Sequence, residues 1–167
     1  MSESLVRCFE PGGAVKDLLF PVAIDQCSID DVDRVEDFLI DEGLNVKDQI
    51  NAELLEEKLT DGLYSRRLLI PKGTFLTGRV HRKPYIDIFI SGDVTVKSFI
   101  ADGTIEETER IKYFRYFEGK PGRKRVLYAH EDTVWVTVDP VETEDVTKAE
   151  EEMSVPYLNQ YNILEVK

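Results

Sequence analysis

Alternation of apolar and polar residues with a period of two, sustained from Leu63 to Val138, is the feature that most constrains the fold of this chain. The alternating segments are rich in β-branched and aromatic residues, as strands are; they are residues 64–73, 74–81, 85–99, 110–117, 123–129 and 132–138. Turn-forming residues separate them at 71–73, 91–93, 102–103, 119–122 and 130–132. Short strands at such regular spacing predict a β-sandwich or a closed barrel.

The residues before the alternating region indicate two helices. Ser28 is a favourable N-cap, and the aspartates that follow it suit the positive end of a helix dipole. Apolar residues then recur at helical spacing as far as the stop signal at Gly43. A second helix is predicted over residues 45–62, with an apolar stripe made of Ile50, Leu54, Leu55 and Leu59.

These patterns divide the chain into three parts. Residues 1–62 are predicted to form an N-terminal arm and two helices that pack on the barrel or on a partner, and residues 63–142 to form the barrel itself. Residues 143–167 are predicted to form a short acidic helix and a tail. We expect the tail to dock, because it carries several large apolar and aromatic groups.

The formal net charge of −12 argues against broad nucleic-acid binding and against docking on an anionic membrane surface. The charge is uneven: residues 64–130 hold 14 Lys and Arg against 7 Asp and Glu, while the rest of the chain holds 7 against 26. Two interpretations stay open. The acidic flanks fold over the basic middle of the same chain or of a neighbouring copy, or the two are solvated surfaces of opposite sign.

Neither cysteine indicates a disulfide framework or a thiol nucleophile. Cys8 and Cys27 lie outside the strand region, form no Cys-x-x-Cys motif and have no histidine nearby in sequence. We therefore expect free thiols in a reducing compartment. Residues 1–25 lack a secretory signal pattern, and no segment approaches the roughly 18 apolar residues of a membrane span. A soluble protein that no standard signal exports is expected.

The strand region resembles the cupin superfamily of jelly-roll barrels in two blocks, IPKGTFLTGRVHRKPYIDIFISGDVTV (residues 70–96) and FEGKPGRKRVLYAHEDTVWVTV (residues 117–138). The stretches IPKGT, TGRVH, PGRKRV and AHEDTVW are similar to those of small cupin-like proteins encoded by tailed bacteriophages. The resemblance covers residues 62–142. It implies a mainly β, cupin-type jelly-roll barrel with a helical N-terminal extension and a short C-terminal helix and tail.

Metal-binding cupins hold a transition metal with two histidines one residue apart, a carboxylate, and a third histidine after a Pro-x-Gly motif. In this chain His81 fits the first position, the second falls on Lys83, and the third falls near Arg125. Asp87 is left as a carboxylate, and His130 is predicted to lie in a turn and not to converge. The resemblance therefore implies an eroded ligand set with His81 as a weak candidate, and we expect no cofactor.

Polar and aromatic residues on inward-facing strand positions form the candidate ligand pocket: Arg79, His81, Tyr85, Asp87, Arg125, Trp135 and Asp139. Tyr85 and Asp139 stand where the phage relatives tend to have histidines. Guanidinium groups match phosphate or carboxylate, so a nucleotide or a sugar phosphate is a candidate ligand. The competing interpretation, which we favour, pairs Arg79 and Arg125 internally with Asp87 or Asp139. Phe75 and Thr77 are predicted to share the face of His81.

A non-catalytic assembly or interaction module of phage type is the function that we favour, either in the virion or as an accessory protein in the cytoplasm of the infected bacterial host. We expect a homo-oligomer through the N-terminal arm and the C-terminal tail, a phage protein as a further partner, and neither nucleic acid nor membrane. The alternatives are capture of a small anionic ligand and a metal-dependent cupin enzyme. Metal-free epimerase-like chemistry would need His81 paired with Asp87 or Asp139. An enzyme is disfavoured, since no Gly-x-Ser-x-Gly, Walker or GxGxxG motif occurs.

Overall fold

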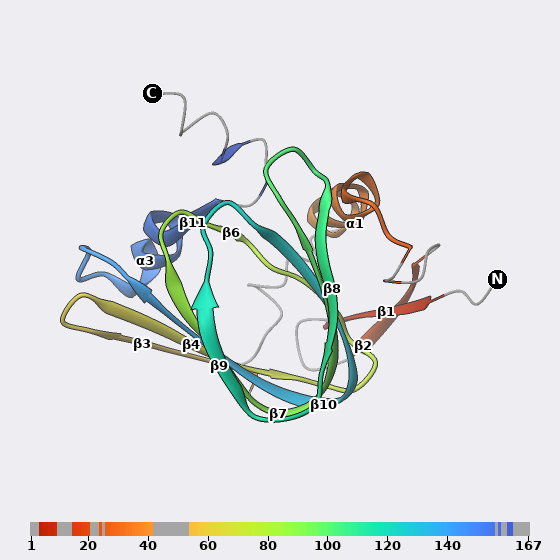
Figure 1. Ribbon diagram of the computed structural model, residues 1–167, viewed down its shortest axis with the longest axis horizontal. Coiled ribbons are helices and arrows are strands. Elements are labelled where there is room, and N and C mark those ends of the chain that lie inside the picture. The colour runs from red at the N-terminus through yellow and green to blue at the C-terminus, as the bar shows by residue number, and fades with distance from the viewer. Residues whose placement is uncertain are drawn as a thin grey trace.

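The computed structural model describes residues 4–9, 15–20, 24, 26–41, 54–155, 157 and 160–161. Strands dominate this part of the chain: β1 (Ser4–Phe9), β2 (Val15–Phe20), β3 (Leu55–Thr60), β4 (Leu63–Ile70), β5 (Phe75–Thr77), β6 (Val80–His81), β7 (Tyr85–Phe99), β8 (Ile105–Ile111), β9 (Arg115–Gly119), β10 (Lys124–Pro140) and β11 (Ser154–Val155). Helices α1 (Ile29–Asp41) and α3 (Val146–Met153) lie on opposite sides of the ring of strands (Figure 1). Neither described helix has the length and apolarity needed to span a bilayer.

Two long antiparallel strands, β7 and β10, run through both layers of the barrel (Figure 1). The described strands of the main sheet follow the order β3–β4–β10–β7–β8, with β5 paired to β10 and β9 paired to β7. The register divides them into two layers. Sheet I contains β3, β4, β9, residues 85–91 of β7 and residues 133–140 of β10. Sheet II contains β5, β8, residues 93–99 of β7 and residues 124–131 of β10.

The two sheets face each other across one apolar core, to which both contribute. Its buried members are Ile70, Phe89, Val94, Val96, Ile111, Ala129 and Trp135. Burial of a large apolar side chain contributes about 1.5–3 kcal/mol relative to its exposure, so this core is what closes the barrel. The prediction of a mainly β, cupin-type jelly-roll barrel with a helical N-terminal extension and a short C-terminal helix is thereby confirmed.

Paired irregularities bend β7 and β10 where the sheets join. The register shifts between Ala129 and Val134 of β10, opposite residues 91–93 of β7. Gly92 has φ +120°, and a Cβ atom there would lie 2.3 Å from Thr133 Oγ1, so glycine is required at this position. The predicted turns at 91–93 and 130–132 were wrong. Both segments are bulges inside continuous strands, because a bulge bends a strand without ending it.

Helix α1 covers the outer face of sheet II. It starts at the predicted N-cap: Ser28 Oγ accepts a hydrogen bond from the Asp31 amide at 3.2 Å. Its apolar side packs on barrel residues in a second buried cluster, made of Cys27, Val32, Phe75, Val80, Phe99 and Val126. The helix thus covers the apolar residues Phe75, Phe99 and Val126 on the outer face of sheet II.

Two lysines of sheet II are also buried on the side that faces α1. Lys124 Nζ pairs with Glu36 Oε1 of α1 at 2.6 Å, and Lys97 Nζ donates to the Cys27 carbonyl at 2.7 Å. Acidic flank and basic barrel therefore meet within one chain. The same holds at the C-terminal flank, where Glu150 and Glu152 pair with barrel cations. These contacts favour the interpretation in which the flanks fold over the middle.

The C-terminal flank folds back on the barrel beside sheet I. Helix α3 begins at its N-cap Asp145 and buries Ala149 and Met153 against Tyr64 of β4, so the short acidic helix predicted after Pro140 is present. Strand β11 then pairs with β6, with Ser154 opposite His81. This pairing holds the end of β6 against the barrel.

The second predicted helix was wrong over residues 55–60, which form β3 and pair with β4; residues 45–53 lie outside the described part of the chain. Leu55 and Leu59 are four residues apart, and that spacing puts two side chains on one face of either a helix or a strand. The spacing therefore did not distinguish the two. Ahead of α1, β1 and β2 pair as an antiparallel hairpin within the predicted N-terminal arm.

Candidate functional site

A buried carboxylate organises the polar interior of the barrel. Asp87 of β7 is 1% exposed, accepts a hydrogen bond from Trp135 Nε1 at 2.8 Å, and pairs with the Arg125 guanidinium. Arg125 Nη1 also donates to the Tyr85 hydroxyl at 3.2 Å. The β7–β10 register brings Asp87 beside Trp135, because it sets residues 86–89 of β7 opposite residues 135–138 of β10. Arg125 lies opposite Ser98 in sheet II and reaches Asp87 across the barrel interior. The favoured internal pairing of Arg125 with Asp87 is what the structure shows.

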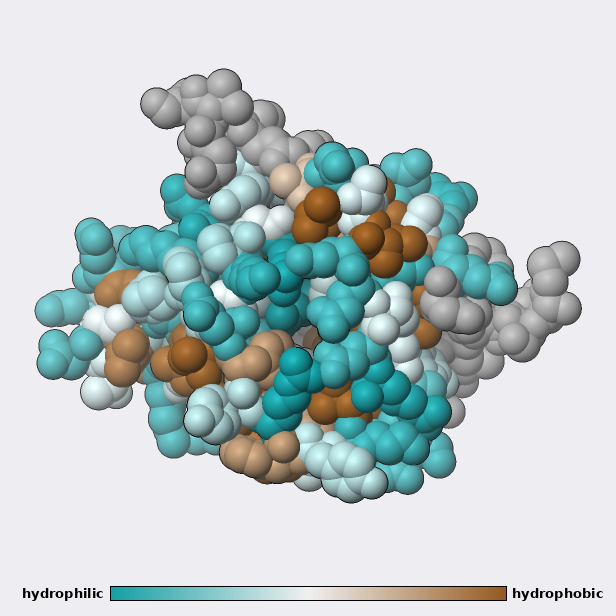
Figure 2. Space-filling view, in the orientation of Figure 1, coloured by the Kyte–Doolittle hydropathy of each residue, from teal (hydrophilic) through white to brown (hydrophobic). Residues whose placement is uncertain are grey.

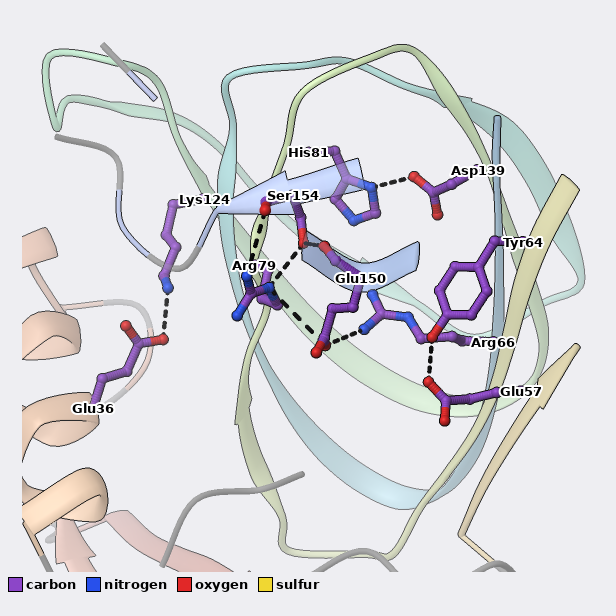
Figure 3. A network of polar contacts seen from close by, with 10 residues as sticks. All are labelled: Glu36, Glu57, Tyr64, Arg66, Arg79, His81, Lys124, Asp139, Glu150 and Ser154. Atoms are coloured by element: carbon purple, nitrogen blue, oxygen red, sulfur yellow. Dashed lines mark hydrogen bonds and ion pairs between the residues drawn. The ribbon is translucent and has the colours of Figure 1, made fainter. Parts of the chain in front are cut away.

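A second buried pair joins β6 to the end of β10. His81 Nδ1 and Asp139 Oδ1 are 2.6 Å apart, with both side chains buried, and they point toward each other in Figure 3. The Tyr85 ring stacks on the imidazole, with centroids 3.6 Å apart and planes inclined by 11°. Among the described residues, Asp139 Oδ2 has no hydrogen-bond partner. Tyr85 therefore links the histidine pair to the Arg125 network.

Burial and neighbouring charge set the ionisation of this network. Burial raises the pKa of the Tyr85 hydroxyl, and the Asp87 carboxylate raises it further, so the phenol stays protonated. Burial alone would lower the pKa of Arg125, but Tyr85 and Asp87 outweigh that effect and raise it. The interior thus holds a permanent cation against a carboxylate. Such an arrangement fixes the orientation of Arg125 and keeps the guanidinium protonated, so it does not act as a base.

Arg79 lies apart from the other candidate residues. Its Nε donates to Ser154 Oγ at 2.8 Å and lies 4.0 Å from Glu150 Oε1, which also pairs with Arg66 at 3.0 Å (Figure 3). The predicted pairing of Arg79 with Asp87 or Asp139 is therefore wrong. Glu150 of α3 bridges two barrel arginines, which ties the C-terminal helix to the barrel.

The shared face predicted for Phe75 and His81 is also wrong. Phe75 packs in the cluster under α1, whereas His81 meets Asp139. The reason is local: β5 ends at Thr77 and β6 begins at Val80, so the alternation is interrupted at residues 78–79. His130, predicted to lie in a turn, instead belongs to β10, and its Nε2 lies 2.7 Å from Thr95 Oγ1.

A cavity of about 200 Å³ opens between β7, β8, β9 and β10. Arg125, Trp135 and Phe117 line it together with Val96, and charged residues of β8 and β9 complete its wall. His81, Tyr85 and Asp139 are not among the described residues that line it. The cavity thus reaches one end of the polar network, the guanidinium, and not the histidine pair.

Ser98, Glu107 and Phe117 line this cavity and were missed from the sequence. Ser98 lies opposite Arg125 on one side and opposite Glu107 on the other, so the three form one row across sheet II. That row depends on the β7–β8 register, which no sequence motif marks. Phe117 sits in β9 of sheet I, and its ring lies 5.3 Å from the Arg125 guanidinium carbon.

Metal-ligating side chains do not gather in the described part of the chain: no group of three or more His, Cys, Asp or Glu residues is placed to hold an ion. His81 has the Asp139 carboxylate beside it. Lys83, at the second ligand position of the cupin pattern, lies 3.8 Å from Glu152. Cys27 is a buried free thiol whose pKa burial raises to about 11.

The sequence matches no protein-family model, and no curated protein matches it. Solved structures with a similar course of strands are cupin-fold proteins. Hydroxypropylphosphonic acid epoxidase from S. wedmorenis, in complex with fosfomycin, is 6% identical over 50% of this chain and 49% of its own, with a TM-score of 0.41. The plu4264 protein from Photorhabdus luminescens is 12% identical over 56% and 80%, with a TM-score of 0.43. KdgF from Halomonas sp. is 16% identical over 55% and 83%, with a TM-score of 0.42.

The first of these likenesses spans about half of the epoxidase chain. At such identities and TM-scores a likeness describes the path of the strands and carries nothing about activity. The relation to phage proteins stays a prediction from the motifs of residues 62–142.

Proposed function

We propose that this chain is a non-catalytic assembly module that associates with a second copy of itself through the outer face of sheet I. The observation that carries the proposal is an apolar patch at the centre of that face, made of Ile86, Ile88, Val134, Val136 and Val138. Ile86 is 42% exposed, although it lies on a central strand. Both described helices pack elsewhere, on sheet II and beside the inner side of β3 and β4.

Aromatic side chains extend this patch at the β9 edge. Tyr116 lies opposite Ile88 and is 70% exposed, and Phe114 and Tyr113 precede it with similar exposure. Figure 2 shows hydrophobic residues at the lower left of the view, near β3, β4 and β9, among hydrophilic ones. Exposed apolar surface of this kind on a flat sheet is typical of a protein-protein contact. A standard interface needs about 800 Å² on each partner.

A second copy fits because residues of opposite charge stand at the two edges of the patch: Glu118 on β9, and on β3 Lys58, which within one copy pairs with Glu56 at 2.8 Å. One cross-strand row runs from Glu118 of β9 through Ile86, Val138 and Ser65 to Lys58 of β3. A two-fold axis parallel to the strands sets Glu118 of one copy opposite Lys58 of the other. The isoleucines and valines of both copies then meet at the centre, as an isologous interface requires.

The proposal moves the predicted contact surface from the arm and the tail to the sheet. In the described part of the tail, the Tyr157 hydroxyl donates to Asp37 of α1 at 3.1 Å, and Tyr161 packs in the cluster under that helix. These residues are used within the chain. The resemblance to phage proteins adds the setting: a virion component or an accessory protein of the infected cell.

Sedimentation equilibrium over a range of protein concentrations tests the proposal. We expect a dimer for the unchanged protein and a monomer for Ile86→Glu, since the change buries a charge twice in a two-fold interface. Ile105→Glu is the matched control, because Ile105 is an exposed isoleucine on β8 of sheet II, and it should remain dimeric. A monomeric unchanged protein, or a dimer that survives Ile86→Glu, would contradict the proposal.

The His81–Asp139 pair favours proton transfer as a second candidate function. A carboxylate on Nδ1 fixes the imidazole tautomer and leaves Nε2 as a base, which is the pairing that metal-free epimerase-like chemistry needs. Deuterium exchange at carbons next to a carbonyl in small ketone substrates, followed by NMR, tests it. Exchange that is lost in His81→Asn would support the idea; no exchange above buffer would remove it.

A further inference from the structure

We infer that the cavity beside Arg125 is a binding site for a small carboxylate with an apolar body. Arg125 is held in place from one side: its Nη1 donates to Tyr85 at 3.2 Å and pairs with Asp87, which is itself fixed by Trp135. The Phe117 ring faces the same guanidinium. The cation is therefore positioned before any ligand arrives.

The other edge of the guanidinium has unmet hydrogen-bonding capacity. Arg125 Nε is buried, and it has no hydrogen-bond partner among the described residues. Both hydrogen bonds to the described network leave from Nη1. Because Nε is inaccessible to solvent, a ligand in the cavity meets this edge through Nη2, with Nε directly beside it. The edge formed by Nε and Nη2 is the side of arginine that matches two carboxylate oxygens. Leaving a buried donor unmet costs about 1–3 kcal/mol, so an acceptor at this edge stabilises the protein.

Charge in the cavity selects a single negative charge over two. Asp87 already balances Arg125, and the remaining arginines of the wall are engaged: Arg115 with Glu109 and Arg123 with Glu106. Glu107 and Lys120 also line the cavity, as does Glu118, whose strand position belongs to the outer face of sheet I. With these charges counted, the described wall holds no excess of positive charge, so a phosphate dianion is less favourable there than a monocarboxylate. The inference thus departs from the nucleotide or sugar phosphate considered from the sequence.

The rest of the wall sets the size and character of the ligand. Val96, Ile111, Phe117 and Trp135 give an apolar floor beside the guanidinium. The volume of about 200 Å³ lies below the roughly 300 Å³ at which drug-sized ligand pockets begin. A planar monocarboxylate of the size of benzoate satisfies both limits, with its ring on the aromatic floor and its carboxylate on Arg125.

The chain carries its own reporter for this site, because its single tryptophan lines the cavity. We expect sodium benzoate to change Trp135 fluorescence in a saturable way, while benzamide, the neutral analogue, and inorganic phosphate do not. Arg125→Lys keeps the charge but loses the planar fork, and it should weaken benzoate binding by about tenfold or more, as loss of a charged hydrogen bond does.

A surface variant keeps the test decisive if Arg125→Lys does not fold. Glu107→Gln removes a carboxylate from the cavity wall and should tighten benzoate binding by a fewfold. Glu151→Gln, at an exposed glutamate of α3 outside the wall, should not. Three results overturn the inference: no saturable response to benzoate at millimolar concentration, equal responses to benzoate and benzamide, or equal affinities in the Glu107→Gln and Glu151→Gln variants. None of these depends on the state of association.

Discussion

Glu36→Gln should show how strongly the barrel depends on helix α1. Glu36 Oε1 lies 2.6 Å from Lys124 Nζ, and the two side chains are 13% and 1% exposed. At an effective dielectric constant of about 20, unit charges at this distance attract by about 6 kcal/mol, part of which desolvation offsets. The net stabilisation from the pair is therefore modest. The larger effect comes from removing one partner, because the other charge then stays buried without its counter-charge.

Removing one partner of a buried ion pair costs about 3–5 kcal/mol, because the other charge stays buried. The Asp33 carboxylate and the Tyr157 ring also lie near the ammonium and remain in the variant. We therefore expect Glu36→Gln to lower the free energy of unfolding by about 2–3 kcal/mol. Lys124→Met should cost less, since the charge left behind is then the more exposed Glu36 carboxylate.

Urea unfolding followed by circular dichroism measures these values, and the double variant completes a cycle in which the two losses should not add. The pH dependence gives a second check. Burial lowers the pKa of Lys124 in the folded state, so the unfolded state binds more protons and stability rises with pH as Lys124 deprotonates. The deficit of Glu36→Gln should shrink on that alkaline side. A deficit under about 0.5 kcal/mol, the range of ordinary surface changes, would refute the reasoning.

Three further outcomes are expected. Gly92→Ala should lower the melting temperature markedly, because its Cβ would lie 2.3 Å from Thr133 Oγ1 at φ +120°, while Gly103→Ala should cost less; a neutral Gly92→Ala would contradict the bulge geometry. Asp93→Asn should remove the loss of stability between about pH 4 and pH 2, because Arg110 lowers the pKa of Asp93 from 3.8 to about 2, and stability is present above that window; an unchanged acid limb would count against it. Cys27, fully buried with a pKa of about 11, should react with a thiol reagent only when α1 opens, and so faster in Glu36→Gln; rapid labelling of the unchanged protein would disprove this.

Alternation in the sequence predicted where the strands of the barrel lie, but it did not always predict which side of a strand faces the interior. In β7 the apolar residues Ile86, Ile88 and Ile90 alternate with Tyr85, Asp87 and Phe89. Burial of apolar residues alone would turn the isoleucines inward and Asp87 outward. The structure does the opposite. The prediction that Asp87 faces the barrel interior agrees with its burial and its hydrogen bond to Trp135, whereas the pattern of apolar residues alone would have placed it outside.

Long-range features of the site were beyond the sequence for a different reason. Arg125 lies in sheet II and Asp87 in sheet I, and both side chains point into the barrel, so the alternation within each strand was enough to suggest their contact. Arg79 contacts Ser154 and Glu150 only because the C-terminal flank folds back on the barrel, and no sequence pattern near residue 79 indicates that contact. Glu107 reaches the cavity through the register of β8 on β7. Contacts between distant segments are set by tertiary packing, which local propensity does not encode.

The use of charge within the chain bears on how two copies would meet. At a net charge of −12, two copies repel each other. The acidic flanks could reduce this repulsion by pairing with the basic barrel of the other copy, but Glu36, Glu150 and Glu152 already pair with their own barrel. Attraction must then come from apolar area, with Glu118 and Lys58 supplying orientation more than affinity. Salt screens repulsion over a Debye length of about 10 Å at 0.1 M and leaves apolar contact intact. Association through sheet I should therefore strengthen as sodium chloride is raised, as measured by sedimentation. Dissociation on adding salt would mean that charge pairs, and not the isoleucine patch, hold the copies together.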